Sequence, residues 1–265
     1  MPESERFPAA ALPPENAYGH TKKLRYILSR IAERARHKDG RLRLLDFGCG
    51  NGQFVSRYLI SDQVDYIGVD FHPPSLAYAR EHFGGPHAAF LEAVPEGRQF
   101  DIIVYADVLE HLDAPADTLA AHARLLSPDG CMIGSVPNGF GPFEVEEWLN
   151  RRLHLSEGIA ALSTARRRLL GGEVPAPADR PYNDESGHLV FFTRARLNKD
   201  VSQAGLRIVD FQHGAVIGAS VSGSILKRSA TLTDWNIRLA DHLPAWAVST
   251  WYFTMVRDSR VSGQA

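Results

Sequence analysis

A glycine-rich turn directly after a short apolar run constrains this 265-residue chain more than any other feature. The run 42–47 leads into residues 48–52, where glycine occupies every second position. Such glycines let the backbone turn tightly and let a ligand approach it. The spacing is G-x-G-x-G, whereas a nicotinamide-dinucleotide site has G-x-G-x-x-G, and residue 53 is Gln. We therefore expect a ligand-binding turn here, and a nicotinamide-dependent enzyme is disfavoured.

Around this turn, short apolar runs alternate with segments of helical period. A first helix is expected before the strands, with Leu24, Ile27, Leu28 and Ile31 on its apolar face. Five strands with helices between them are expected to follow. The expected strands are 42–47, 66–70, 88–91, 101–105 and 131–136, and the expected helices are 51–60, 73–83 and 116–126, the last ended by a turn at 127–130. This alternation predicts an α/β fold, a parallel sheet with helices on both faces.

Past Gly139 the alternation breaks, and we expect a helical cap insertion at about 140–187. It is interpreted as two helices and a Pro- and Gly-rich loop above the carboxyl edge of the sheet, where ligands bind in such folds. The alternation resumes with a helix over 194–204, a strand over 207–211, a helix over 233–243 and a strand over 248–256. Residues 1–14, with four prolines, are predicted to be a flexible tail, and 15–265 one domain.

The composition excludes several classes of protein. The 29 Lys and Arg residues against 31 Asp and Glu residues give a net charge of −2, which argues against nucleic acid as a partner. Two cysteines are too few for a disulfide framework or a four-cysteine zinc site. The longest uncharged stretches are about 14 residues, short of the roughly 17–25 that span a bilayer. With no signal-peptide pattern, we expect a cytoplasmic protein without a transmembrane segment.

An acidic residue supports a ligand site at the glycine turn. Asp70 ends the second predicted strand, 18 residues after Gly52. A carboxylate in this position can accept hydrogen bonds from both hydroxyls of a ribose. The alternative is a solvated carboxylate at a strand end, which the glycine turn before it makes the weaker interpretation.

Four segments, in this order and spacing, resemble the class I S-adenosylmethionine-dependent methyltransferases. They are LLDFGCGNG, YIGVD, FDIIVYADVLEHL and LLSPDGCMIGSVPN, over about residues 42–138, and they are most similar to the ubiquinone-biosynthesis O-methyltransferase-like branch. The resemblance implies a Rossmann-like sheet of seven mostly parallel strands whose last strand, 248–256, is antiparallel. It also implies S-adenosyl-L-methionine as the cofactor.

The resemblance assigns cofactor-binding roles by position. The glycine-rich segment would hold the methionine part, Asp70 the ribose, and the end of the fourth strand would lie against the cofactor. The residues so implied are Asp46, Gly48, Cys49, Gly50, Gly52, Asp70, Phe71, Tyr105, Ala106 and Asp107. Family members often hold adenine with an Asp where this chain has Phe90, so backbone groups or Glu92 would take that role. Tyr18, His20 and Lys22 are weaker candidates to close over the cofactor, since a solvated helix start is favoured there.

Two histidines are the candidates for catalysis. Methyl transfer needs the acceptor and the methyl group in line, and a hydroxyl acceptor benefits from a general base. His111 lies in a segment that matches the family's LEH box, and His188 opens a segment similar to the family's H…F-[S/T]. A purely structural role for each histidine stays open. No carboxylate cluster is assignable to a divalent ion, so no metal is expected.

The sequence thus predicts a methyltransferase that acts on a small-molecule acceptor, at a hydroxyl oxygen, in biosynthesis. Methylation at nitrogen or carbon, and a cofactor-binding module without catalysis, are the alternatives. Methylation of nucleic-acid bases is disfavoured, because residues 106–109 do not match N/D-P-P-Y/F. Arginines at 151, 152 and 166–168 make the insertion basic, which favours an anionic or amphipathic acceptor, or peripheral contact with an acidic membrane surface.

Overall fold

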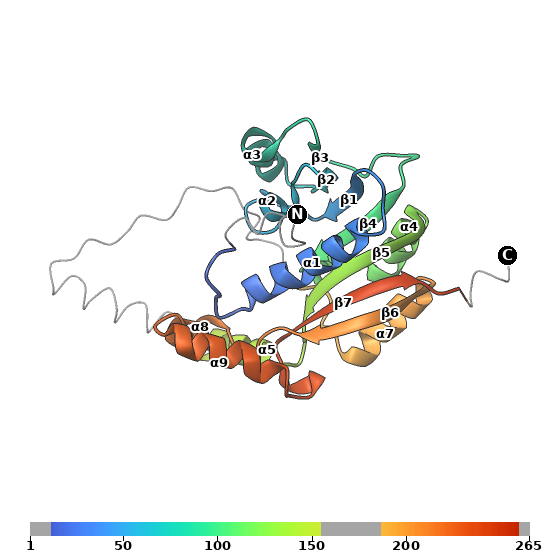
Figure 1. The fold of residues 1–265 in the computed structure, drawn as a ribbon. Helices are drawn as coiled ribbons and strands as arrows, with labels where there is room; N and C mark the ends of the chain where they lie inside the picture. The colour runs from blue at the N-terminus through green and yellow to red at the C-terminus, as the bar shows by residue number, and fades with distance from the viewer. Residues whose placement is uncertain (1–11, 155–186, 260–265) are drawn as a thin grey trace.

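A computed structural model describes residues 12–154 and 187–259, which form one seven-stranded sheet with helices packed against it (Figure 1). The strand order is β3-β2-β1-β4-β5-β7-β6. The strands are β1 (Leu42–Phe47), β2 (Val64–Val69), β3 (Ala88–Leu91), β4 (Phe100–Ala106), β5 (Leu126–Pro137), β6 (Leu206–His213) and β7 (Thr250–Arg257). All neighbours pair in parallel except β7, which is antiparallel to both β5 and β6. The predicted fold class is therefore confirmed.

The helices form two layers and a group beyond the carboxyl end of the sheet. They are α1 (His20–Ala35), α2 (Ser56–Leu59), α3 (Pro73–Phe83), α4 (Pro115–Ala123), α5 (Pro142–Leu153), α7 (Arg194–Gln203), α8 (Ser220–Leu226) and α9 (Ala230–Ala240), with 3-10 turns η2 (Leu109–His111) and η3 (Ala245–Ala247). Helices α5, α8 and α9 lie together below the glycine-turn end of the sheet in Figure 1.

Each face of the sheet has its own apolar core. Leu42 and Leu44 of β1 pack with Ile27 and Ile31 of α1 and with side chains of α3, whereas Leu45 points to the opposite face. There it joins side chains of α4 and α7. Successive residues of a strand face opposite sides, so the leucines of β1 supply both cores. Burying each such side chain contributes about 1.5–3 kcal/mol.

The structure corrects three predicted elements. The helix expected over 51–60 is reduced to α2, because Gly52 has a φ of 78° and Val55 is also outside the helical region. The turn expected at 127–130 lies inside β5, where the pairing jumps from Phe100↔Leu126 to Ile102↔Cys131. Helix α8 was not predicted, because its seven residues show no apolar period.

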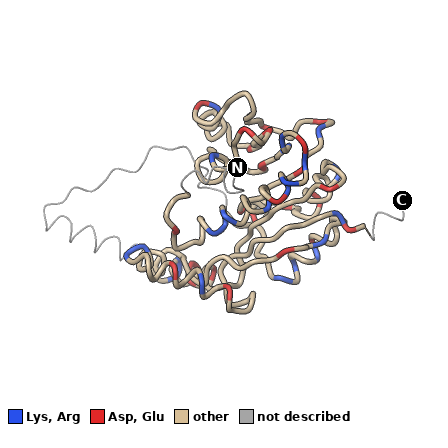
Figure 2. Tube along the Cα trace, viewed as in Figure 1, with Lys and Arg blue, Asp and Glu red and all other residues tan. Residues whose placement is uncertain are grey.

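The ends of the described ranges cut through two predicted segments. Of the cap insertion, α5 is described, while residues 155–186, with the arginines at 166–168, lie outside the described residues. Of the predicted tail, 1–11 lie outside, and the carbonyl of Pro13 accepts a hydrogen bond from Thr21 Oγ1 at 2.8 Å. Lys and Arg are interspersed with Asp and Glu along the described trace (Figure 2). Within these ranges, no helix is both long and apolar enough to cross a membrane.

A buried carboxylate joins the beginning of β4 to β1. Asp101 accepts hydrogen bonds from the Arg43 amide at 2.9 Å and Arg43 Nη2 at 3.1 Å, and it pairs with Lys38. Burial alone would raise the pKa of this carboxyl. The hydrogen bonds from Arg43 and Lys38 outweigh burial, so the pKa of Asp101 lies well below its usual range.

We predict that Asp101→Asn lowers the free energy of unfolding by about 1–3 kcal/mol, because the amide leaves two cations without a counter-charge. Urea denaturation at pH 7 measures this. Asp65→Asn is the matched control: Asp65 lies on the neighbouring strand opposite Arg43, but its contacts with His87 and Arg41 are partly exposed and are worth little. Equal destabilisation by the two substitutions would contradict the prediction.

Candidate functional site

A cavity of about 740 Å³ opens at the carboxyl ends of β1, β2 and β4. It lies at the crevice between β1 and β4, where the strand order reverses and where open α/β sheets bind their ligands. Its volume is within the range of small-molecule sites. Its walls are formed by residues before and within α1, the glycine turn, η2, α5, the segment at 188 and the beginning of β7.

Ten of the twelve predicted site residues line this one cavity. They are Asp46, Gly48, Cys49, Gly50, Asp70, Phe71, Ala106, Asp107, His111 and His188. Tyr105 is not among the lining residues: its ring is fully buried in the core and its hydroxyl is 2.7 Å from His122 Nδ1. Gly52 does not line the cavity either, and a Cβ there would lie 2.7 Å from Phe83. Its role in the structure is close packing of the turn against α3.

The glycine turn is shaped by its hydrogen bonds to the end of β2. Gly48 has a φ of 78° and its amide donates to the Val69 carbonyl at 2.7 Å, while a Cβ at this position would collide with Val108 at 2.5 Å. The Gly50 amide donates to Asp70 Oδ2 at 2.8 Å. Asp70 Oδ1 accepts from the His72 amide at 2.9 Å. Each oxygen of Asp70 thus keeps a lone pair for a ligand.

Beneath the turn, Asp46 is almost completely buried. It accepts hydrogen bonds from Ser56 Oγ at 2.9 Å and from the Tyr66 hydroxyl at 2.7 Å, which fixes the end of β1 to α2 and β2. Burial raises the pKa of Asp46 to about 6, against the opposing effect of these two hydrogen bonds. Burial, with the nearby carboxylates of Asp46 and Asp70, also raises the pKa of the Cys49 thiol. The raised pKa keeps the Cys49 thiol protonated, so Cys49 is not a reactive thiolate.

The middle of the cavity holds an ion pair between the first helix and the end of β4. Lys23 Nζ pairs with Asp107, which has a φ of 58° and accepts a hydrogen bond from Ser135 Oγ at 2.5 Å. Although burial alone would raise the pKa of Asp107, Lys23 and Ser135 hold it below its usual range. Burial and the Lys23 cation lower the pKa of His20 to about 4. Lys23 was missed by the sequence analysis, whereas Lys22 faces Asp241 instead, 2.6 Å away.

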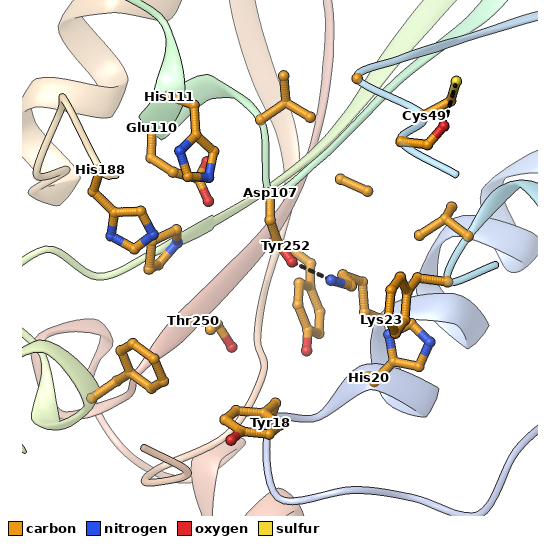
Figure 3. Close-up of a pocket in the computed structure, with 18 of the residues that line it drawn as sticks. Tyr18, His20, Lys23, Cys49, Asp107, Glu110, His111, His188, Thr250 and Tyr252 are labelled. Atoms are coloured by element: carbon orange, nitrogen blue, oxygen red, sulfur yellow. Dashed lines mark hydrogen bonds and ion pairs between the residues drawn. The ribbon is translucent and has the colours of Figure 1, made fainter. Parts of the chain in front are cut away.

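At the other end of the cavity, Glu110, His111 and His188 come together (Figure 3). One ring nitrogen of each histidine and a carboxylate oxygen of Glu110 lie within 4.8 Å of one another. The Glu110 carbonyl accepts hydrogen bonds from the amides of Leu189 and Val190, at 2.8 and 3.0 Å, and so holds the segment of His188 against η2. Figure 3 shows Asp107 between these three side chains and Cys49.

Glu110 is a residue of this site that the sequence analysis did not single out. It is 1% exposed, and burial, with the nearby Asp107, raises its pKa well above the usual range. The expectation of no metal rested on the lack of an assignable carboxylate cluster, whereas this group contains one carboxylate and two histidines, and His188 lies 77 residues after His111. No local pattern predicts the backbone pairing that brings the two histidines together, with ring centroids 5.1 Å apart.

Comparisons with known proteins agree on one family. A family model described as "Methyltransferase domain" matches residues 18–210. A ubiquinone biosynthesis O-methyltransferase of Roseobacter denitrificans is 30% identical over 129 residues, which is 43% of this chain and 52% of that protein. The chain spans about half the length of the first curated relatives it matches.

Solved structures show the same fold. An S-adenosylmethionine-dependent methyltransferase from Clostridium acetobutylicum matches with a TM-score of 0.55 at 13% identity, over 89% of this chain and 92% of that chain. One from Mesorhizobium loti matches with a TM-score of 0.55 at 15% identity, over 90% of this chain and 98% of that chain.

The raised pKa of Asp46 predicts a pH dependence of stability. The folded state holds this proton more tightly than the unfolded state, so stability falls as the pH rises from about 4 to about 6. In Asp46→Asn this loss disappears. Between pH 4.5 and pH 7, the variant should therefore gain roughly 1–3 kcal/mol relative to the original chain, measured by urea denaturation.

Asp101→Asn is the control, because the lowered pKa of Asp101 places its pH-dependent contribution at more acidic pH. Its difference from the original chain should stay nearly constant between these two pH values. An Asp46→Asn protein with an unchanged pH dependence would refute the assignment.

Proposed function

This chain belongs to the class I S-adenosylmethionine-dependent methyltransferases, and we propose that it methylates a hydroxyl oxygen of a small-molecule acceptor in a biosynthetic reaction. One observation carries the proposal: the cavity has two chemically different ends. A glycine turn and an oriented carboxylate form one end, and a carboxylate with two imidazoles forms the other. The first end suits a nucleoside cofactor and the second suits a polar acceptor group.

The residues of the first end fit S-adenosylmethionine. The open lone pairs of Asp70 can accept from the two ribose hydroxyls, and the glycine turn lets the cofactor approach the backbone. Phe71 lines the cavity with a ring that is 77% exposed, against which adenine can stack. Phe90 is buried against Tyr66, and Glu92, which lies 4.0 Å from Arg80, is not among the cavity residues. Backbone groups are therefore our assignment for the adenine amino group.

When bound, S-adenosylmethionine supplies a methyl group activated by the positive sulfonium. The chain then has to hold the acceptor oxygen in line with that methyl group, and such positioning alone is worth roughly 7–11 kcal/mol. His111 and His188 line the cavity beyond Asp107, where they can contact the acceptor oxygen. A group that accepts the hydroxyl proton lowers the barrier further, and so does a group that stabilises the negative charge on the oxygen after the proton has left.

The choice of acceptor is supported by the relatives and by the walls of the cavity. The curated relatives are named as O-methyltransferases of ubiquinone biosynthesis. Phe143 of α5 lines the cavity, and the same helix carries the exposed Trp148 and Leu149 and ends with Arg151 and Arg152. Apolar and cationic groups on one helix beside the cavity favour an amphipathic, anionic acceptor, and they also suit contact with an acidic membrane surface.

Asp70→Ala should weaken the binding of S-adenosylhomocysteine, measured by isothermal titration calorimetry. The loss of even one hydrogen bond to a charged acceptor, about 1.5–3 kcal/mol, corresponds to roughly a 10- to 150-fold higher Kd. Asp65→Ala is the matched control, since Asp65 lies near the beginning of β2, the strand that Asp70 follows, but is not among the residues that line the cavity. If the affinity of Asp70→Ala equals that of the original chain, the assignment of Asp70 to the ribose is wrong.

The reaction itself is tested with S-adenosylmethionine that carries a deuterated methyl group. We expect mass spectrometry to show one labelled methyl group on an alcohol or phenol that also bears a carboxylate, phosphate or alkyl tail. Fragmentation locates the label. Label on nitrogen or carbon would contradict the proposed oxygen acceptor, and a chain that binds no S-adenosylhomocysteine would contradict the enzyme function itself.

A further inference from the structure

Glu110, His111 and His188, which we name the Glu-His-His cluster, bring three possible metal-ligand atoms together at one end of the cavity. His111 Nδ1 lies 3.1 Å from the carbonyl of Gly187, and His188 Nδ1 lies 2.9 Å from Glu144 Oε1. A carbonyl and a carboxylate oxygen only accept hydrogen bonds, so each Nδ1 carries the proton and donates it. Nε2 is therefore the ring nitrogen of each histidine that can offer a lone pair to a ligand.

The remaining groups of the cluster are unsatisfied. Within the described residues, no hydrogen bond is formed by Nε2 of His111 or of His188. Glu110 Oε2 is buried and has no hydrogen-bond partner there either. An orphaned carboxylate oxygen in the interior costs free energy unless a cation or a donor satisfies it. Lys23 does not serve, because it is engaged by Asp107.

We propose that the Glu-His-His cluster binds a divalent first-row transition-metal ion at the acceptor end of the cavity. Two imidazoles and one carboxylate are the donor set that such ions favour over Mg²⁺ or Ca²⁺, which prefer oxygen ligands alone. Ligand atoms about 2.0–2.2 Å from a shared ion lie roughly 3–4 Å apart. The present spacing, within 4.8 Å, is closed by small side-chain rotations.

The groups behind the cluster match those that orient metal-binding histidines. Such a histidine almost always donates its other ring N–H to a carboxylate or a backbone carbonyl. His188 has the first arrangement, through the buried Glu144 of α5, and His111 has the second, through Gly187. Glu144 is thus a positioning residue for His188.

The role of the ion in catalysis rests on the proposed function, but its binding does not. Three protein ligands leave coordination positions free for the acceptor hydroxyl, whose pKa an adjacent cation lowers. The hydroxyl proton then leaves to solvent, and an oxygen lone pair forms the bond to the methyl carbon. The C–S bond breaks as its electron pair moves to sulfur. In this reaction the histidines hold the ion, and neither has to take the proton.

The test is a titration of chelator-treated full chain with Mn²⁺, followed by electron paramagnetic resonance of the free ion. We expect one tightly bound Mn²⁺ per chain. Glu110→Gln and His188→Gln should each raise the Kd at least tenfold, and Glu144→Gln should raise it by a smaller factor. His87→Gln is the control, because His87 is a partly exposed histidine that pairs with Asp65 far from the cavity.

Binding of S-adenosylhomocysteine, at the opposite end of the cavity, verifies that each variant is folded. If Glu110→Gln does not fold, the His188→Gln variant still decides the result, because His188 is less buried than Glu110. The metal site is overturned if the chain binds no Mn²⁺, or if the cluster variants bind it as well as His87→Gln does. Full methyl transfer by chelator-treated protein would overturn the catalytic role of the ion and leave the proposed function intact. Mn²⁺ binding without S-adenosylhomocysteine binding would support the site and defeat the proposed function.

Discussion

The site depends on one hydrogen bond, from the Gly50 amide to the Asp70 carboxylate. It joins the residues after β1 to the residue after β2, and so fixes the glycine turn and the acid relative to each other. A backbone amide as the donor has no rotamers to restrict, so this contact costs little conformational entropy. Because Asp46 fastens the same turn from below through Ser56 and Tyr66, the turn is held from both sides. The ligand meets a surface that is already arranged.

Two neighbouring acids at the end of β4 have opposite electrostatic surroundings. Asp107 is matched by Lys23 and by the Ser135 hydroxyl, and its pKa is lowered although burial opposes this. Glu110 lies in the 3-10 turn that follows and forms no ion pair with the described residues, and burial raises its pKa although Lys23 has a weaker opposing effect. The difference arises from α1, which places Lys23 in a direct ion pair with Asp107, whereas its effect on Glu110 is weaker. The first acid therefore closes the cavity as part of an ion pair, while the second remains available to a ligand.

The sequence predicted the elements whose signal is local. Strands β1 to β5 follow from apolar runs, and α3 was predicted with its observed bounds, from Pro73 to Phe83. The helix predicted over 51–60 failed where backbone geometry overrides periodicity, because Gly52, which was included in that helix, takes a φ of 78°. Tyr105, Ala106 and Asp107 were assigned together, but successive residues of a strand face opposite sides. Ala106 thus lines the cavity, while the Tyr105 ring enters the core.

The two ends of the cavity also differ in how far apart their residues lie in the sequence. The glycine turn and Asp70 fall within 23 residues, on consecutive strands of one β-α-β unit, so a motif can describe them. The acceptor end combines Glu110, Glu144 and His188, joined by hydrogen bonds between segments that no motif relates. Changes in α5 or after residue 187 can therefore alter the acceptor end without moving Asp70. The two ends are coupled through β4, since Asp107 and Glu110 follow the same strand, and that strand sets the distance between the glycine turn and the Glu-His-His cluster.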